Sequence, residues 1–157
     1  MLQLLGCFKN VFTFVEINKK ALEKAQIIEI LRGSGLKKTP VRVAVLAALM
    51  GNNTALSQPQ LEALFGQHES RITIYRVLRD LEEAHLIHRI YDKDGVAKYA
   101  LYKHNHAHNH VHFNCTTCND LVCLEAFEIE IPTLPQGYKM NAVRYTVEGI
   151  CQKCDKI

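Results

Sequence analysis

The chain has 157 residues, which suffices for one domain or two small ones. Apolar residues make up 48% and charged residues 22%, and no apolar run approaches the roughly 20 residues that span a bilayer, so general disorder and a transmembrane helix are excluded. The net charge is +3 but uneven: residues 21–103 hold twelve Lys and Arg against nine Asp and Glu, and residues 104–157 hold four against six, which indicates two parts with different tasks.

Residues 1–20 form an N-terminal extension to which we assign no role, including its single Cys7. The extension is apolar but has no basic leader and no small-residue cleavage site, so we expect neither a signal peptide nor a membrane anchor. We therefore expect a cytoplasmic protein, in which disulfides are rare.

Residues 21–103 begin with short predicted helices. A first helix is expected over residues 21–32, because apolar residues recur at helical spacing: Leu22, Ala25, Ile28 and Leu31. Thr39 is a good N-cap and Pro40 suits the first turn of a second helix, which we expect to run to about Met50. Ser57 and Gln60 form a capping-box signal for a third, short helix that stops at Gly66.

A fourth helix and a hairpin complete this domain. Ser70 caps a helix to about Ala84, and its expected buried stripe is Ile74, Val77, Leu78 and Leu81. Strands are predicted at residues 86–91 and 96–101, because the Asp-Gly turn between them is a strong hairpin signal. Helices followed by a hairpin predict a winged helix-turn-helix, with the fourth helix as recognition helix and the hairpin as wing.

The polar face of the fourth helix predicts contact with double-stranded DNA. Arginine binds guanine edges and phosphates, and Tyr and Thr contact phosphate or thymine methyl groups. The candidate residues are Arg71, Thr73, Tyr75, Arg76 and Arg79, with Lys37, Lys38 and Arg42 as phosphate contacts near the second helix. The alternative is a solvated face balanced by nearby acidic residues, and the position of the helix within a helix-turn-helix favours DNA.

Residues 104–157 hold two CxxC pairs, Cys115 with Cys118 and Cys151 with Cys154. Each pair presents two thiolates from a tight turn, and two pairs complete the tetrahedral site that is typical of structural zinc. Because four thiolates close the coordination shell, we expect a structural role. The metal would stabilise a small domain that has little core of its own.

Alternating histidines precede the first cysteine pair, at positions 104, 106, 108, 110 and 112. In an extended chain they share one face, and imidazole binds Zn, Fe, Ni and Cu. His110 and His112 are the leading candidates for a second metal site, whereas His104, His106 and His108 are either further ligands or a loose tract. Cys123 is either a buried small residue or a thiolate ligand of that second metal, and both interpretations stay open. His85 and His88 are expected to be structural or surface residues.

The stretch from Gly35 to Cys154 resembles the ferric uptake regulator (Fur) family. The motifs that carry the resemblance are GLKKTPVRVAVLAAL, ESRITIYRVLRDLEEAHLI, HNHVHFNCTTCNDLVCLE and GICQKC, in that order. The resemblance implies a homodimeric repressor with an N-terminal winged helix and a zinc-stapled α/β dimerisation domain, an α+β protein overall. It further implies a regulatory metal at the hinge, with His110 and His112 as ligands and Tyr75 and Arg76 at DNA-contacting positions.

The chain departs from the family at several ligand positions. A His before the third helix aligns with Ala55, a Glu on the return strand of the wing with Ala100, and a Glu after the first cysteine pair with Cys123. A His before the second cysteine pair aligns with Val143. The dimerisation helix is shortened to residues 127–131 or absent. The regulatory site must therefore use other ligands, and the candidates are Cys123 and the extra histidines.

We therefore predict a metal-responsive repressor, not an enzyme, that binds a pseudo-palindromic operator as a homodimer and has no membrane or small-molecule partner. The cofactors are structural zinc and a second, regulatory metal. Zinc is favoured for the second site because a thiolate with imidazoles selects it, and Fe(II) and Mn(II) are the alternatives. An iron- or peroxide-sensing regulator, a constitutive DNA- or protein-binding scaffold and a His-rich metal buffer are the competing hypotheses.

Overall fold

The computed structural model describes residues 23–66, 68–102, 111–124, 130, 132–140 and 143–156. They form an α+β fold of helices and two small sheets. The chain divides into two compact units, one ending at Ala48 and one beginning at Leu49. The predicted domain boundary after residue 103 falls outside the described residues and stays a prediction. Among the described residues, no helix is both long and apolar enough to cross a membrane.

The first two helices follow the sequence signals closely. Residues 23–33 are helical, and α2 (Pro40–Gly51) begins directly after Thr39, whose hydroxyl accepts the Arg42 N–H at 3.4 Å. The buried face of the first helix differs from the expected one. Its buried residues are Ile27 and Leu31, whereas Ala25 is exposed and Ile28 is half-buried, so the simple three-residue spacing misplaced the stripe.

The third and fourth helices carry the predicted N-caps. The capping box of α3 (Gln58–Phe65) is complete: the Ser57 hydroxyl accepts the Gln60 N–H, and the Gln60 side chain accepts the Ser57 N–H at 2.8 Å. At the start of α4 (Arg71–Glu83), the Ser70 hydroxyl accepts the Thr73 N–H at 3.1 Å. The buried stripe of α4 is the predicted one: Ile74, Val77, Leu78 and Leu81.

The wing is the hairpin of β2 (Ile87–Tyr91) and β3 (Ala97–Leu101), as predicted. Gly95 has φ +75° in the connecting turn, a conformation that glycine adopts without strain. A two-residue strand that the sequence did not reveal, β1 (Leu56–Ser57), pairs with the outer edge of β3, so the antiparallel order is β1-β3-β2.

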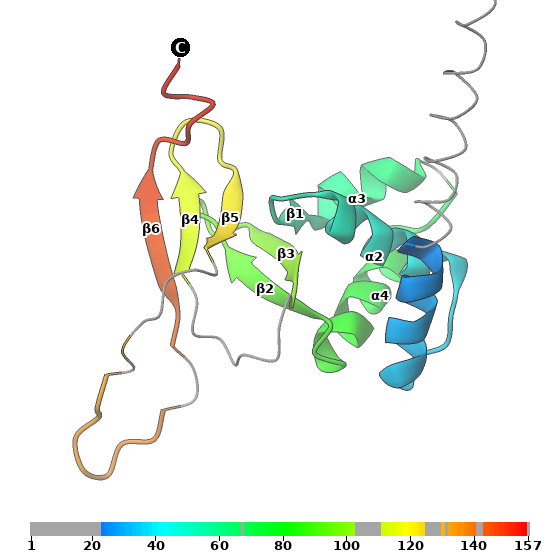
Figure 1. Ribbon diagram of the computed structural model, residues 1–157, viewed down its shortest axis with the longest axis horizontal. Helices are drawn as coiled ribbons and strands as arrows, with labels where there is room; N and C mark the ends of the chain where they lie inside the picture. The colour runs from blue at the N-terminus through cyan, green and yellow to red at the C-terminus, as the bar shows by residue number, and fades with distance from the viewer. Residues whose placement is uncertain are drawn as a thin grey trace, which may run out of the picture. The chain divides into compact units, whose positions relative to one another are not determined.

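The second sheet contains β4 (Val111–Cys115), β5 (Leu121–Leu124) and β6 (Tyr145–Gly149), with β4 in the middle (Figure 1). Strand β4 is antiparallel to β5 and parallel to β6. Strand β6 spans five residues. The predicted remnant of the dimerisation helix, residues 127–131, lies outside the described residues except for Glu130, which is not helical.

A small apolar cluster joins the two sheets. Ala55, Ile90 and Leu121 are buried together, and the half-buried Ala100 and Cys123 pack against them. The Ala55 N–H also donates to the Leu121 carbonyl at 2.8 Å. The wing strands are therefore held against β5, and this contact positions the sites described next.

Candidate metal centres and DNA-facing helix

The four cysteines of the two CxxC pairs lie together at one end of the second sheet. Their sulfur atoms all lie within 4.8 Å of one another. Parallel pairing of β4 with β6 sets Cys115 beside Gly149, two residues before Cys151. The Thr116 N–H donates to the Gly149 carbonyl at 2.8 Å, and the Cys151 N–H donates to Cys115 Sγ at 3.3 Å. Strand pairing thus brings two pairs that are far apart in the sequence to one place.

The spacing of these sulfur atoms fits a tetrahedral metal ion. Cys118 Sγ and Cys151 Sγ are 3.8 Å apart, and all four cysteines are free. A disulfide needs about 2.05 Å between sulfurs. Four thiolates that each lie about 2.3 Å from zinc are separated by about 3.8 Å along the edges of the tetrahedron. The donor set and the spacing therefore both match structural zinc.

Cys115 is the thiol of this group that ionises most readily. Hydrogen bonds from the backbone N–H groups of Cys118 and Cys151 lower its pKa to about 6. At Cys154 the hydrogen bond with the Cys151 side chain acts in the opposite direction and raises the pKa to about 12. A thiolate is thus present near neutral pH, and binding of a metal must release protons from other thiols.

A second cluster joins His88 of β2, His112 of β4 and Cys123 of β5, whose donor atoms also lie within 4.8 Å of one another. His112 Nε2 is 3.3 Å from His88 Nε2, and Cys123 Sγ is 3.6 Å from the same nitrogen. Both imidazoles are buried, with exposed fractions of 5% for His88 and 8% for His112. Three groups that bind transition metals thus connect the wing to the second sheet.

Strand register explains how this cluster forms. His112 lies directly opposite Cys123, so both side chains share one face of the second sheet. His88 reaches the same place because Ile90, two residues further on, is buried against Leu121. The ring of Tyr102 packs against the ring of His88 with 4.8 Å between centroids.

The second cluster contains two of the predicted regulatory ligands and one residue that the sequence analysis placed elsewhere. His112 and Cys123 are together. His104, His106, His108 and His110 lie outside the described residues. His88, expected to be structural or at the surface, lies in the cluster instead, whereas His85 is exposed and outside it.

The exposed face of α4 carries the predicted DNA-contacting side chains. Arg71, Arg76 and Arg79 are exposed, and the Tyr75 side chain is 50% exposed. Arg79 lies 3.6 Å from Glu83, and Arg71 lies 3.3 Å from Glu62 of α3.

Two of the other predicted DNA contacts are partly engaged within the chain. The Thr73 hydroxyl pairs with that of Ser70 at 2.9 Å, so it also serves the N-cap. Lys37 and Lys38 are exposed before α2, and Arg42 is half-buried and donates to the Lys37 carbonyl at 3.0 Å. Arg76 is exposed.

Comparison with known proteins identifies the family. The family model described as the ferric uptake regulator family matches residues 33–148. The chain belongs to the ferric uptake regulator family. The ferric uptake regulation protein of Bacillus subtilis is 32% identical over 133 residues, covering 80% of this chain and 89% of that protein. A peroxide-responsive repressor, PerR, of Staphylococcus aureus is 25% identical over 147 residues, covering 89% of this chain and 97% of that one.

Solved structures agree with this fold. A zinc uptake regulator complexed with zinc and DNA superimposes with a TM-score of 0.63, at 19% identity, covering 85% of this chain and 93% of that one. The predicted α+β fold and the family resemblance are therefore both confirmed.

Two positions at which this Fur family member lacks the ligand that the resemblance implies lie close together in the structure. Ala55 and Ala100, where the resemblance implies a His and a Glu, both pack in the apolar cluster between the sheets. Ala100 lies directly opposite His88 in the wing. The position on β3 where the resemblance implies a ligand thus lies beside a histidine of the neighbouring strand. The register of the predicted hairpin is the sequence signal that pairs His88 with this position.

Proposed function

We propose that this Fur family member, a metal-responsive regulator, is a repressor that senses zinc through His88, His112 and Cys123. The observation that carries the proposal is the set of donor distances in that cluster. With bonds of about 2.05 Å to nitrogen and 2.3 Å to sulfur, a tetrahedral zinc ion separates two nitrogens by about 3.3 Å and nitrogen from sulfur by about 3.6 Å. The distances in the cluster are 3.3 Å and 3.6 Å.

The types of donor atom also distinguish zinc from ions that prefer octahedral coordination. Fe(II) and Mn(II) favour oxygen donors, and the two positions where the family resemblance implies a His and a Glu are alanines here. A thiolate with two imidazoles therefore favours zinc.

The remaining position of the tetrahedron is assigned to the histidine tract. We propose His110 as the leading candidate for the fourth ligand, with His108, His106 and His104 as the alternatives. A pocket of about 150 Å³ beside the cluster is lined by His88, His112 and Val143, among others, and provides room for an incoming ligand. The four-cysteine site is proposed to hold a separate, structural zinc ion.

Metal binding at this cluster involves a residue of the wing directly. His88 belongs to the wing strand β2, whereas His112 and Cys123 belong to the second sheet. An ion held by all three favours the arrangement in which these strands lie side by side. It activates DNA binding only to the extent that it binds that arrangement more tightly; a change from 1:99 to 99:1 needs about 5.5 kcal/mol of differential affinity.

The DNA-binding form is proposed to be a cytoplasmic homodimer. It places α4 in the major groove, the wing beside it and Lys37, Lys38 and Arg42 near phosphates. Two-fold symmetry then implies a pseudo-palindromic operator. The domains are proposed as residues 21–103 for DNA binding and 104–157 for zinc binding and dimerisation. We propose a regulator and not an enzyme.

Arg76→Ala tests the assignment of α4. If Arg76 binds a base edge, the substitution should weaken binding to the operator by roughly 1–3 kcal/mol and relax specificity at one base pair. Lys37→Ala should instead weaken all duplexes similarly and reduce the salt dependence of binding. Binding isotherms at several salt concentrations check both variants. Equal affinity of the wild type and Arg76→Ala for operator and random DNA would remove α4 from the interface.

The function itself is tested by the metal dependence of DNA binding. The probe is a duplex that the zinc-loaded protein selects from a random-sequence pool. We expect a shifted complex with zinc, its loss when a chelator removes the second ion, and recovery when zinc is restored. Binding that persists without the second ion would support a constitutive scaffold, and several weak metal sites without any selected duplex would support a metal buffer.

A further inference from the structure

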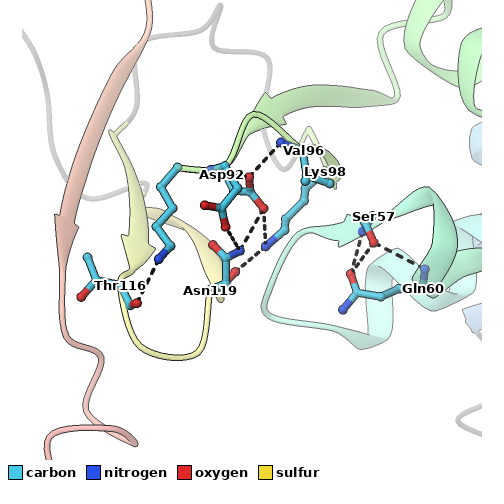
Figure 2. A network of polar contacts seen from close by, with 9 residues as sticks. Ser57, Gln60, Asp92, Val96, Lys98, Thr116 and Asn119 are labelled. Carbon is cyan, nitrogen blue, oxygen red and sulfur yellow. Dashed lines mark hydrogen bonds and ion pairs between the residues drawn. The ribbon is translucent and has the colours of Figure 1, made fainter.

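A polar network connects the turn of the wing to the turn that carries Cys118. Figure 2 shows its main members, Asp92 and Lys98 of the wing and Thr116 and Asn119 of the cysteine turn. The Lys98 ammonium donates to the Asn119 carbonyl and lies 3.3 Å from Asp92 Oδ2. The Asn119 amide donates to the same carboxylate oxygen at 3.3 Å. We call Lys98, Asp92 and Asn119 the latch.

Two further contacts flank the latch. The Asn119 amide also donates to Asp94 Oδ2 at 3.0 Å, and the Lys93 ammonium donates to the Thr116 carbonyl at 3.3 Å. Both run from the wing turn to the cysteine turn. The wing thus meets this turn through several charged groups at once, which distinguishes the contact from a single surface ion pair.

Burial makes the latch costly to open. The Lys98 side chain is 10% exposed and that of Asp92 is 1% exposed. A buried charge that loses one partner is strongly destabilising. Because Asn119 supplies part of the solvation of both charges, a displaced cysteine turn leaves the ion pair in the wing incompletely satisfied.

Asp92 and Asn119 also form hydrogen bonds within the turns to which they belong. Asp92 Oδ1 accepts the N–H groups of Asp94 and Val96 at 3.0 and 2.8 Å, so the same carboxylate shapes the wing turn. Asn119 follows Cys118 directly, has φ +60°, and donates its N–H to the Cys115 carbonyl at 2.9 Å, which closes the cysteine turn. These hydrogen bonds join the turn that carries Cys118, through Asn119, to Asp92 and Lys98.

We propose that Lys98, Asp92 and Asn119 are positioning residues through which the four-cysteine site sets the placement of the wing. The inference rests on the proposed zinc binding at that site. Zinc in this site fixes the cysteine turn, the turn holds the latch, and the latch holds the wing for DNA binding. The structural metal thus controls DNA affinity separately from the ion at His88, His112 and Cys123.

Two variants open the latch from opposite sides and leave all four thiols intact. Lys98→Met removes the ammonium and keeps a long side chain. Asn119→Gly removes the amide but keeps the carbonyl, and glycine adopts a φ of +60° without strain. Lys139→Met is the matched control, because it removes a lysine charge at an exposed position outside the latch.

Hydrogen–deuterium exchange of the full-length, zinc-loaded protein is the measurement, with zinc content determined in parallel. We expect each latch variant to keep its zinc and to exchange the amides of residues 93–96 about tenfold faster or more, with the control unchanged. The double variant should add little to either single one. Wild-type exchange in both latch variants, at full zinc content, would overturn the latch but leave the zinc site standing. Absence of zinc from the wild type would refute the proposed structural zinc itself.

Discussion

Replacing Cys115 by serine should remove one zinc ion per chain and unfold the second sheet. Cys115 is fully buried at the end of β4, and its sulfur accepts the N–H of Cys151, so it connects the two cysteine pairs. Among the described residues of β4, β5 and β6, the buried hydrophobics are only Leu121 and Cys115, which is little core for an independent fold. Structural zinc contributes roughly 10–16 kcal/mol in small sites, and that binding free energy is folding free energy.

Metal analysis together with thermal unfolding followed by circular dichroism checks this prediction. Cys123→Ser is the matched control, since Cys123 lies in the other cluster. It should keep the zinc of the four-cysteine site. An unchanged zinc content and melting temperature in Cys115→Ser would remove the four-cysteine site as a metal centre.

Replacing His88 by alanine should abolish the metal response while leaving the structural zinc in place. His88 is the only member of the second cluster that belongs to the wing, so its loss separates the metal from the element that it has to position. Changes that merely misorient a ligand cost 10–100-fold in metal affinity, and loss of the ligand itself should cost about a hundredfold or more. Zinc at ordinary free concentrations would then no longer activate DNA binding.

Zinc-dependent binding of the selected duplex, measured in metal-buffered solution, tests His88→Ala. His68→Ala is the control, because His68 is an exposed histidine outside both clusters. It should respond to zinc like the wild type. A wild-type zinc response in His88→Ala would show that the metal acts without the wing strand, and His110 with the remaining tract would become the better ligand set.

Local signals predicted the local structure well. Thr39, Ser57 and Ser70 cap the helices that they were expected to cap, because an N-cap depends on only a few neighbouring residues. The Asp-Gly turn likewise predicted the hairpin that forms the wing. The four cysteines were found for a similar reason, since the spacing within each CxxC pair already implies shared coordination.

Long-range pairing is what the sequence did not reveal. Strand β1 has two residues and exists because β3 pairs with it. The parallel pairing of β4 with β6 joins segments more than thirty residues apart (Figure 1). The sequence around His88, between a helix end and a strand, did not reveal that this residue lies beside His112 and Cys123, because that contact depends on how the wing packs against β4 and β5.

The sensed metal is the central claim, and the most direct test is a ranking of metals by the free concentration that gives half-maximal DNA binding. The protein should first hold only its structural zinc, and Zn(II), Fe(II) and Mn(II) should then be supplied from metal buffers without oxygen. We predict that zinc acts at the lowest free concentration and that Cys123→Ser loses this advantage. Activation by Fe(II) or Mn(II) at a lower free concentration than zinc, or an intact zinc response in Cys123→Ser, would contradict a zinc sensor and favour an iron-sensing regulator.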